Sequence, residues 1–142
     1  MSDEYQLSRF ISAQEAVYGQ VLDELRAGHK RSHWMWFIFP QIKGLGFSLT
    51  ARKYAISGLD EASAYLQHET LGTRLMECTG LVLQIENRSV HNIFGYPDDL
   101  KFRSSMTLFD QVAGENRLFE QALVKYFAGE ADQKTLTLLA TR

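Results

Sequence analysis

The fold class is decided by the stretch Gly28-His29-Lys30-Arg31-Ser32-His33-Trp34-Met35-Trp36-Phe37-Ile38-Phe39-Pro40-Gln41. Its second half, residues 34–39, is a run of apolar residues that periodicity alone assigns neither to a buried strand nor to a short buried helix. No second strand candidate of comparable quality exists elsewhere, and a lone strand leaves its backbone groups without partners. We therefore expect a short helix that Ser32 caps and Pro40 ends.

Helix signals also occur on both sides of this stretch. Ser12 stands three residues before Glu15, which is the spacing of a capping box, and Gly28 stands where a C′ glycine belongs. These signals predict a helix over residues 13–27, preceded by a short helical turn through residues 7–11.

Similar start signals recur through the rest of the chain. Helices are expected to begin at Ser48 or Thr50, Asp60, Thr70, Ser89, Pro97, Asn116 and Asp132. Gly44-Leu45-Gly46 is expected to form a turn and not a phosphate loop, because no strand–loop–helix unit surrounds it. The sequence thus predicts an all-α fold: one domain over residues 1–142, with about seven or eight short-to-medium helices.

Composition excludes several classes of protein. Of the 142 residues, 45% are hydrophobic and 23% are charged, which is typical of a globular domain and not of a disordered chain. The formal charge of −2 gives no global basic field, so we expect no nucleic-acid partner. The acidic start Met1-Ser2-Asp3-Glu4 lacks the features of a secretory signal, and no apolar run is long enough to span a bilayer. A cytoplasmic protein with no membrane partner is expected. Cys78 is expected to be a buried, inert thiol.

Two polar segments are candidates for a binding site. Lys30 and Arg31 follow a helix end, where cations interact favourably with the helix dipole, and that role alone accounts for them. The alternative is an anion site, in which Arg31, Ser32, His33 and the free backbone amides of the next helix bind the anion. Trp34 or Trp36 would then stack on a planar group of the ligand.

The second segment is 101–107, in which Lys101 and Ser105 share a helix face and Ser104 is adjacent. Neighbouring serines within a helix lower its propensity, so a buried hydrogen bond or a ligand should compensate. A serine nucleophile with a lysine base is the less favoured interpretation, because the spacing reverses the known Ser-x-x-Lys order. No metal site and no cofactor are expected, since the histidines and the cysteine lack a recognised ligand spacing.

Several motifs together resemble an uncharacterised bacterial family, the family of domain of unknown function 1810. They are Tyr5-x-Leu7-x-Arg9-Phe10, Lys30-Arg31-Ser32-His33-Trp34-Met35-Trp36-Phe37, Gly44-Leu45-Gly46-x-Ser48, Leu71-Gly72-x-Arg74-Leu75, Asp99-x-Lys101-x-x-Ser104-Ser105-Met106-Thr107-Leu108-Phe109 and Asp132-x-x-Thr135-Leu136. The resemblance covers nearly the whole chain and implies an all-helical single domain, with no established activity or catalytic residue. Members often carry the automatic label calpastatin, although calpastatin acts through disordered segments and this composition is that of a compact domain.

The leading hypothesis is a domain that binds a small anionic ligand, such as one bearing phosphate, in a polar and aromatic pocket. Whether it also catalyses a reaction is left open by the sequence. The candidate binding residues are Lys30, Arg31, His33, Trp34, Tyr54, His68, Lys101, Ser104 and Ser105. In this scheme Arg31 and Lys101 hold the anion, and His33 or His68 would move a proton. The alternative is a protein-interaction or scaffold domain without activity, which predicts a large exposed apolar patch instead of a polar pocket.

Overall fold

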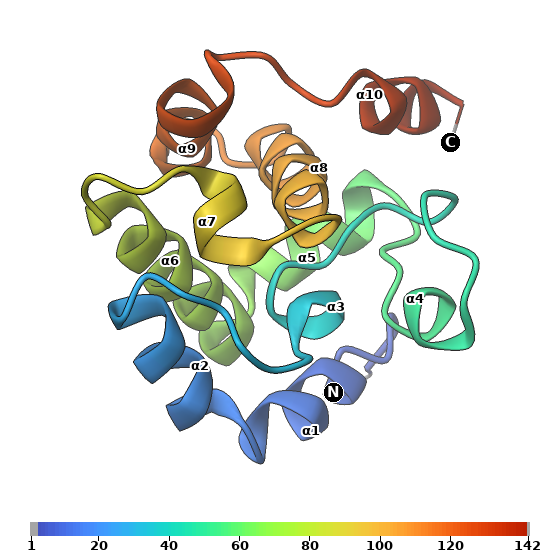
Figure 1. Ribbon diagram of the computed structural model, residues 1–142. Coiled ribbons are helices and arrows are strands. Elements are labelled where there is room, and N and C mark those ends of the chain that lie inside the picture. Colours follow the sequence, from blue (N-terminus) through green and yellow to red (C-terminus); the bar gives the residue numbers. More distant parts are fainter. Residues whose placement is uncertain (1–2, 142) are drawn as a thin grey trace.

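The computed structural model describes residues 3–141, and every regular element within them is a helix (Figure 1). The ten helices of these residues are α1 (Ser8–Glu15), α2 (Tyr18–Arg26), α3 (Met35–Ile38), α4 (Leu49–Lys53), α5 (Leu59–Gln67), α6 (Glu69–Gln84), α7 (Val90–Phe94), α8 (Asp98–Asp110), α9 (Leu118–Phe127) and α10 (Gln133–Ala140). The all-α class is confirmed, whereas the predicted number of seven or eight helices is wrong. Three of the helices, α3, α4 and α7, have only four or five residues and are too short to show a full apolar repeat.

The helix predicted over residues 13–27 is instead two helices, α1 and α2. The Asp3 carboxylate accepts hydrogen bonds from the backbone amides of Leu7 (2.6 Å) and Ser8 (3.1 Å), so α1 begins earlier than the capping-box spacing suggested. Ser12 consequently lies inside α1 and caps nothing. The two helices differ in their packing: α1 packs mainly on α3 and also on α6, whereas α2 packs on α6.

The apolar run 34–39 forms the short helix α3, as expected, and Pro40 follows it directly. Ser32 does not cap this helix. Trp34 occupies the N-cap position, but its side chain does not cap the helix, and the Ser32 hydroxyl donates to Glu24 instead (2.6 Å). The segment is therefore anchored by a tertiary contact and not by a local cap.

One isolated β-bridge joins Ile42 to Ile56, the only such pairing found in residues 3–141. The Ile56 amide donates to the carbonyl of Gln41 (2.9 Å), and the Lys43 amide donates to the carbonyl of Ile56 (2.8 Å). These bonds fix both ends of the loop that contains α4. The Gly44-Leu45-Gly46 turn lies in this loop, as predicted, and Gly44 has a φ of 109°, which favours glycine.

Several predicted caps are present. The side chains of Ser48, Ser89 and Asp132 accept hydrogen bonds from backbone amides at the starts of α4, α7 and α10. Gly28 has a φ of 71° just after α2, as expected of a C′ glycine. Because these interactions join residues three apart or fewer, the sequence shows them directly.

Three further predicted helix starts are displaced, and one of them is Asn116, since α9 has Arg117 at its N-cap. α6 is capped by His68 and not by Thr70: the His68 ring atom Nδ1 accepts from the amides of Thr70 (3.1 Å) and Leu71 (3.3 Å). α5 has Gly58 at its N-cap, and Asp60 lies in its first turn, where a carboxylate interacts favourably with the helix dipole.

The central element is α8, which packs most extensively on α9 and also contacts α5, α7 and α10 (Figure 1). The fully buried ring of Phe102 on α8 lies edge-on to Phe39, with centroids 5.0 Å apart, and stacks on Phe94 at 4.8 Å. Burying a phenylalanine side chain contributes about 1.5–3 kcal/mol. This aromatic cluster holds the chain after α3 against the first turns of α8.

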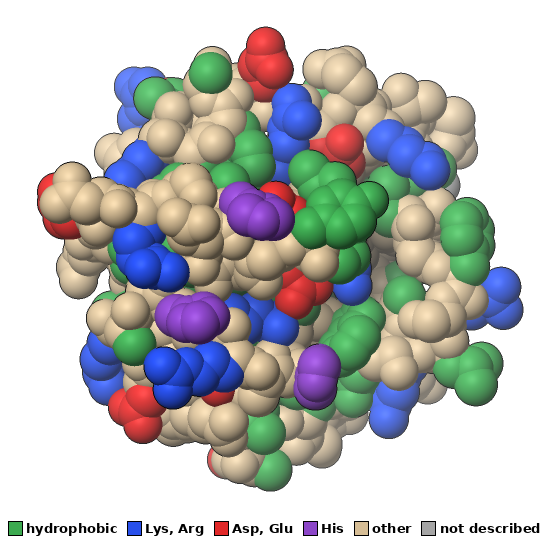
Figure 2. Space-filling view, viewed as in Figure 1, with side chains coloured by type: hydrophobic (Ala, Val, Ile, Leu, Met, Phe, Trp, Pro, Cys, Tyr) green, Lys and Arg blue, Asp and Glu red, His purple; other side chains and the backbone are tan. Residues whose placement is uncertain are grey.

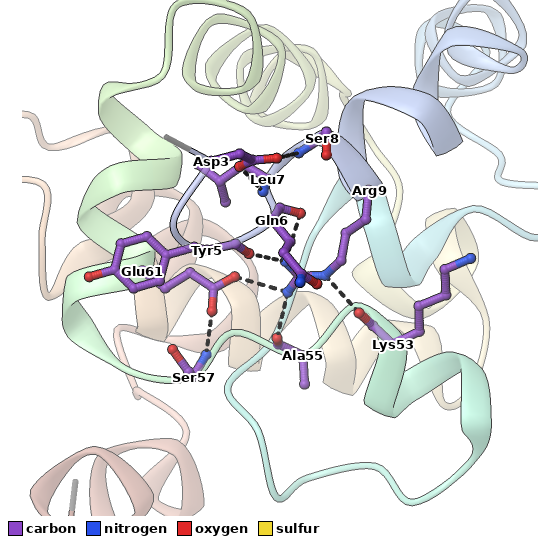
Figure 3. Close-up of polar contacts among 10 residues, drawn as sticks. All are labelled: Asp3, Tyr5, Gln6, Leu7, Ser8, Arg9, Lys53, Ala55, Ser57 and Glu61. Atoms are coloured by element: carbon purple, nitrogen blue, oxygen red, sulfur yellow. Dashed lines mark hydrogen bonds and ion pairs between the residues drawn. The ribbon is translucent and has the colours of Figure 1, made fainter. Parts of the chain in front are cut away.

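Arg9 ties α1 to the segment between α4 and α5 (Figure 3). Its guanidinium donates to the carbonyls of Tyr5 (2.5 Å), Lys53 (2.7 Å) and Ala55 (2.9 Å) and pairs with the Glu61 carboxylate at 2.9 Å. Glu61 is itself buried and also accepts from a backbone amide at the start of α5. The C-terminal end of α4 is thereby held in place, which positions one wall of the groove described next.

Candidate functional site

The basic stretch after α2 is organised around the buried carboxylate of Glu24. Its Oε1 atom accepts hydrogen bonds from the amides of Arg31 (2.7 Å) and Ser32 (3.0 Å) and from the indole nitrogen of Trp34 (3.0 Å). Its Oε2 atom accepts from the Ser32 hydroxyl (2.6 Å) and the Gln20 side-chain amide (3.1 Å). One carboxylate thus accepts hydrogen bonds from Arg31, Ser32 and Trp34 of this stretch and from Gln20 of α2.

Burial by itself raises the pKa of Glu24, but the hydrogen bonds from Ser32, the Arg31 amide and Trp34 outweigh it and lower the pKa from 4.5 to about 2. Glu24 is therefore ionised at neutral pH. The Ser32 hydroxyl and the buried Trp34 indole are used within the fold, and neither lines the open groove described below.

Lys30 and Lys101, one from each predicted polar segment, meet at the Asp98 carboxylate at the start of α8. The Lys30 ammonium lies 2.8 Å from Oδ2, and the Lys101 ammonium lies 3.6 Å from Oδ1. The Lys30 side chain is 6% exposed, with its ammonium 5.1 Å from the centre of the Trp34 ring. Lys101 is 27% exposed, with its ammonium 5.1 Å from the centre of the Trp36 ring. The two segments do come together, with Lys30 buried and Lys101 at the surface.

Lys101 lines an open groove of about 420 Å³, which we call the Trp36 groove. It lies between the loop that precedes α4, the first half of α8 and the start of α10. Its aromatic and polar lining consists of Trp36, Gln41, Ser48, Lys101, Ser104, Asp132 and Lys134. Its apolar lining includes Leu45, Phe47, Pro97 and Leu100. Figure 2 shows hydrophobic side chains beside this hollow, between the start of α8 and the α4 loop.

Ser104 and Ser105 differ in their surroundings. The Ser104 hydroxyl lies 2.8 Å from Oδ2 of Asp132 and 3.2 Å from the carbonyl of Leu100, and Ser104 lines the Trp36 groove. Ser105 is fully buried, and its hydroxyl has no hydrogen-bond partner within residues 3–141. The buried hydrogen bond expected to compensate for adjacent serines is therefore present at Ser104 alone.

Tyr54 lines a small hollow of about 20 Å³ that adjoins the Trp36 groove and shares Trp36 and Gln41 with it. The Tyr54 ring packs on Phe10 and Phe37, with centroids 5.8 and 5.4 Å apart. Tyr54 thus connects the hollow beside the groove to the aromatic side chains of α1 and α3.

The remaining predicted residues lie elsewhere. Arg31 is exposed and lines a separate hollow of about 140 Å³ with Asp23 and His29. His33 is exposed, and His68 is engaged as the cap of α6. Of the nine candidates, the structure therefore brings Lys101 and Ser104 into the groove and Tyr54 beside it.

Sequence reasoning missed several groove residues. The sequence predicts for Trp36 only the stacking role that Trp34 could fill equally well, and it gives no signal for Gln41. Ser48 and Asp132 carried a clear signal, but one that marks helix caps. Lys134 lies on α10 and Lys101 on α8, so no local pattern indicates that the two lysines line one groove.

Two other kinds of site were sought among residues 3–141. No group of three or more His, Cys, Asp or Glu side chains is placed to hold a metal ion. No helix in this part of the chain has the length and apolar character required to cross a membrane.

Comparison with known proteins gives a family but no activity. No curated protein matches the chain significantly. The crystal structure of the conserved hypothetical protein Rv1873 from Mycobacterium tuberculosis superposes with a TM-score of 0.96, at 56% sequence identity, over 97% of this chain and 99% of that one. The family described as protein of unknown function (DUF1810) matches residues 4–139. The motifs quoted from the sequence, the all-helical fold and this match together show that the chain belongs to the DUF1810 family.

Proposed function

We propose that the domain binds a small anionic, phosphate-bearing ligand in the Trp36 groove. The observation that carries the proposal is that Lys101 of α8 and Lys134 of α10 line the same groove, beside the Trp36 ring. Two lysines supply charge, the Ser48 hydroxyl and the Gln41 amide supply directional hydrogen bonds, and the indole supplies a flat apolar wall. Such a mixture of apolar surface and a few polar groups is typical of small-molecule sites.

The charge on Lys101 is incompletely neutralised within the protein. Its nearest carboxylate, Asp98, is already paired with Lys30 at 2.8 Å, and Lys101 lies farther away, at 3.6 Å. Two ammonium groups therefore share one carboxylate, so the cluster of Lys30, Lys101 and Asp98 carries one net positive charge beside the groove. At a separation of about 4 Å, two unit charges interact with about 1 kcal/mol in water and about 4 kcal/mol near a protein surface.

The test is a thermal-shift screen followed by calorimetric titration. Pyrophosphate, ribose 5-phosphate and AMP are suitable first probes, since each carries phosphate and a ligand of the native state raises its unfolding midpoint. We expect Lys101→Gln and Lys134→Gln each to weaken binding about tenfold, which corresponds to about 1.4 kcal/mol. Arg26→Gln is the matched control, because Arg26 is an exposed cation on α2, away from the groove. Silence across the panel, or equal binding by all variants, would overturn the proposal.

A second candidate function, a protein-interaction domain, is favoured by the apolar rim of the same groove. Phe47 is 69% exposed and Leu100 is 49% exposed, and both line the groove. Leu49 and Tyr96, also exposed, are neighbours in sequence of the lining residues Ser48 and Pro97. Clustered exposed apolar residues are a feature of interaction surfaces. This function predicts no response to the phosphate panel, together with concentration-dependent association in sedimentation experiments that Phe47→Ser abolishes and Arg26→Gln does not.

A further inference from the structure

We infer that the ligand of the Trp36 groove is a phosphorylated sugar, whose hydroxyl groups donate hydrogen bonds to Asp132. This inference rests on the proposed anion-binding function and narrows the ligand class. A free sugar phosphate and the ribose phosphate part of a nucleotide both carry the phosphate and the hydroxyl groups that this inference requires. It follows from an acidic side chain in a groove that is otherwise built for an anion.

The Asp132 carboxylate is oriented by three hydrogen bonds to one of its oxygens. Oδ2 accepts from the Ser104 hydroxyl (2.8 Å), the Thr135 hydroxyl (2.5 Å) and the Thr135 amide (3.3 Å). The Asp132 backbone amide donates to the Thr107 hydroxyl (2.8 Å), which fixes the main chain at the same point. Within residues 3–141, Oδ1 accepts no hydrogen bond, while Asp132 lines the groove. One carboxylate oxygen is therefore held in place and unused.

Helix capping does not require this second oxygen. The cap of α10 uses Oδ2 alone, and a serine, threonine or asparagine would supply one acceptor equally well. Asp132 lines the same groove as Lys101, Ser104 and Lys134, so a carboxylate acceptor accompanies the two cations.

A bare anion and a phosphorylated sugar respond differently to this acceptor. An ionised aspartate accepts hydrogen bonds and donates none, so it repels inorganic phosphate while the lysines attract it. A sugar phosphate satisfies both sets of groups, because its phosphate meets the lysines and a ring hydroxyl donates to Asp132. A hydrogen bond to a charged group contributes about 1.5–3 kcal/mol, which is more than a tenfold preference over a ligand that lacks the donor. The Trp36 ring offers a flat surface to the apolar face of a sugar or a base.

The decisive variant is Asp132→Asn. Asparagine is an equally good N-cap, and its carbonyl oxygen can replace Oδ2 in the bonds from Ser104 and Thr135. Its NH2 group then occupies the position of Oδ1, so a donor of the same size replaces the free acceptor. Dissociation constants would be measured by calorimetry for ribose 5-phosphate, AMP and inorganic phosphate at one fixed ionic strength.

We expect the wild type to prefer ribose 5-phosphate over inorganic phosphate at least tenfold. The Asp132→Asn variant should reduce this ratio of affinities to near one. It should weaken the binding of ribose 5-phosphate, and it should leave the affinity for inorganic phosphate unchanged or raise it. The ratio of affinities is the correct readout, since the loss of a negative charge from the groove strengthens the binding of all anions alike. AMP binding more tightly than ribose 5-phosphate would identify a nucleotide as the source, and the reverse would identify a free sugar phosphate.

Asp132→Ser is the second variant, because serine keeps a cap hydroxyl and removes both carboxylate oxygens; the same loss of preference is expected. If wild type and both variants bind ribose 5-phosphate and phosphate with unchanged ratios, the role of Asp132 is overturned while the anion site stands. If no phosphate compound binds the wild type, the proposed function fails and this inference fails with it. Unfolding midpoints of the variants separate a lost contact from a disrupted α10.

Discussion

Replacing Glu24 with glutamine is expected to destabilise the domain by about 3 kcal/mol at neutral pH. The substitution keeps the shape of the side chain, removes its charge and puts an NH2 group in place of Oε2, which can no longer accept from Ser32 and Gln20. The three donors on Oε1, namely the amides of Arg31 and Ser32 and the Trp34 indole, would then bond a neutral acceptor. Hydrogen bonds to charged groups contribute about 1.5–3 kcal/mol and neutral ones about 0.5–1.5 kcal/mol, so each bond loses about 1 kcal/mol.

The pKa of Glu24 leads to the same magnitude. Its depression from 4.5 to about 2 in the folded state corresponds to about 3 kcal/mol, at about 1.36 kcal/mol for each pKa unit. Because the folded pKa is the lower one, this stabilisation is fully present above the unfolded pKa of 4.5 and is lost as the pH falls towards 2. The Glu24→Gln variant lacks this dependence. The difference between the two proteins should therefore shrink to about 1 kcal/mol at pH 3.

The assay is urea denaturation of wild type and variant at pH 7 and pH 3, with linear extrapolation to water. Comparing the two proteins at each pH cancels the titration of all other carboxylates. Glu120→Gln is the control, because Glu120 pairs with Arg117 on an exposed surface and should change stability by less than about 0.5 kcal/mol. A Glu24→Gln difference below about 1 kcal/mol at pH 7, or one that stays constant at pH 3, would refute the account of this carboxylate.

Three further predictions concern the interior. Gly72→Ala should lower the free energy of unfolding, measured by thermal denaturation, by on the order of 3 kcal/mol or more, since an added Cβ would lie 2.0 Å from the carbonyl oxygen of Leu66. An unchanged midpoint would contradict the close packing of α5 on α6. Cys78 should resist alkylation by iodoacetamide in the native protein at about pH 8 and react in urea, because the thiol is buried and burial raises its pKa to about 12. Rapid labelling of the native protein would show that the thiol is accessible. Lys30→Met should cost about 2 kcal/mol in urea denaturation, because Asp98 would keep a single cation 3.6 Å away, and a neutral result would mean that the buried pair adds no net stability.

Much of the fold can be predicted from the sequence because its signals are local. The caps at Ser48, Ser89 and Asp132 and the C′ glycine at Gly28 act within three residues of the helix that they begin or end. Prediction fails where a distant group competes with the local one. The Glu24 carboxylate on α2 accepts a hydrogen bond from the Ser32 hydroxyl in this way, so Ser32 does not cap α3.

The residues of the candidate site also differ in how far the sequence alone predicts their role. Residue types alone marked Lys101 and Ser104 as polar groups that packing does not require, and both line the Trp36 groove. The sequence also marked Lys30 and Trp34, and only the tertiary structure shows that Asp98 and Glu24 occupy their polar atoms inside the fold.

From the sequence alone follow the all-α class, the helix starts at Ser48, Ser89, Pro97 and Asp132, and the presence of two polar segments. Only the tertiary structure shows which of those polar groups line the Trp36 groove and that α10 brings Lys134 and Asp132 to the groove beside Lys101. The physical reason is that helix capping and apolar periodicity depend on neighbours within one or two turns. Which charges pair and which side chains line a groove depend on how whole helices pack. That packing depends on residues far apart in the sequence, so no short stretch of the chain predicts it.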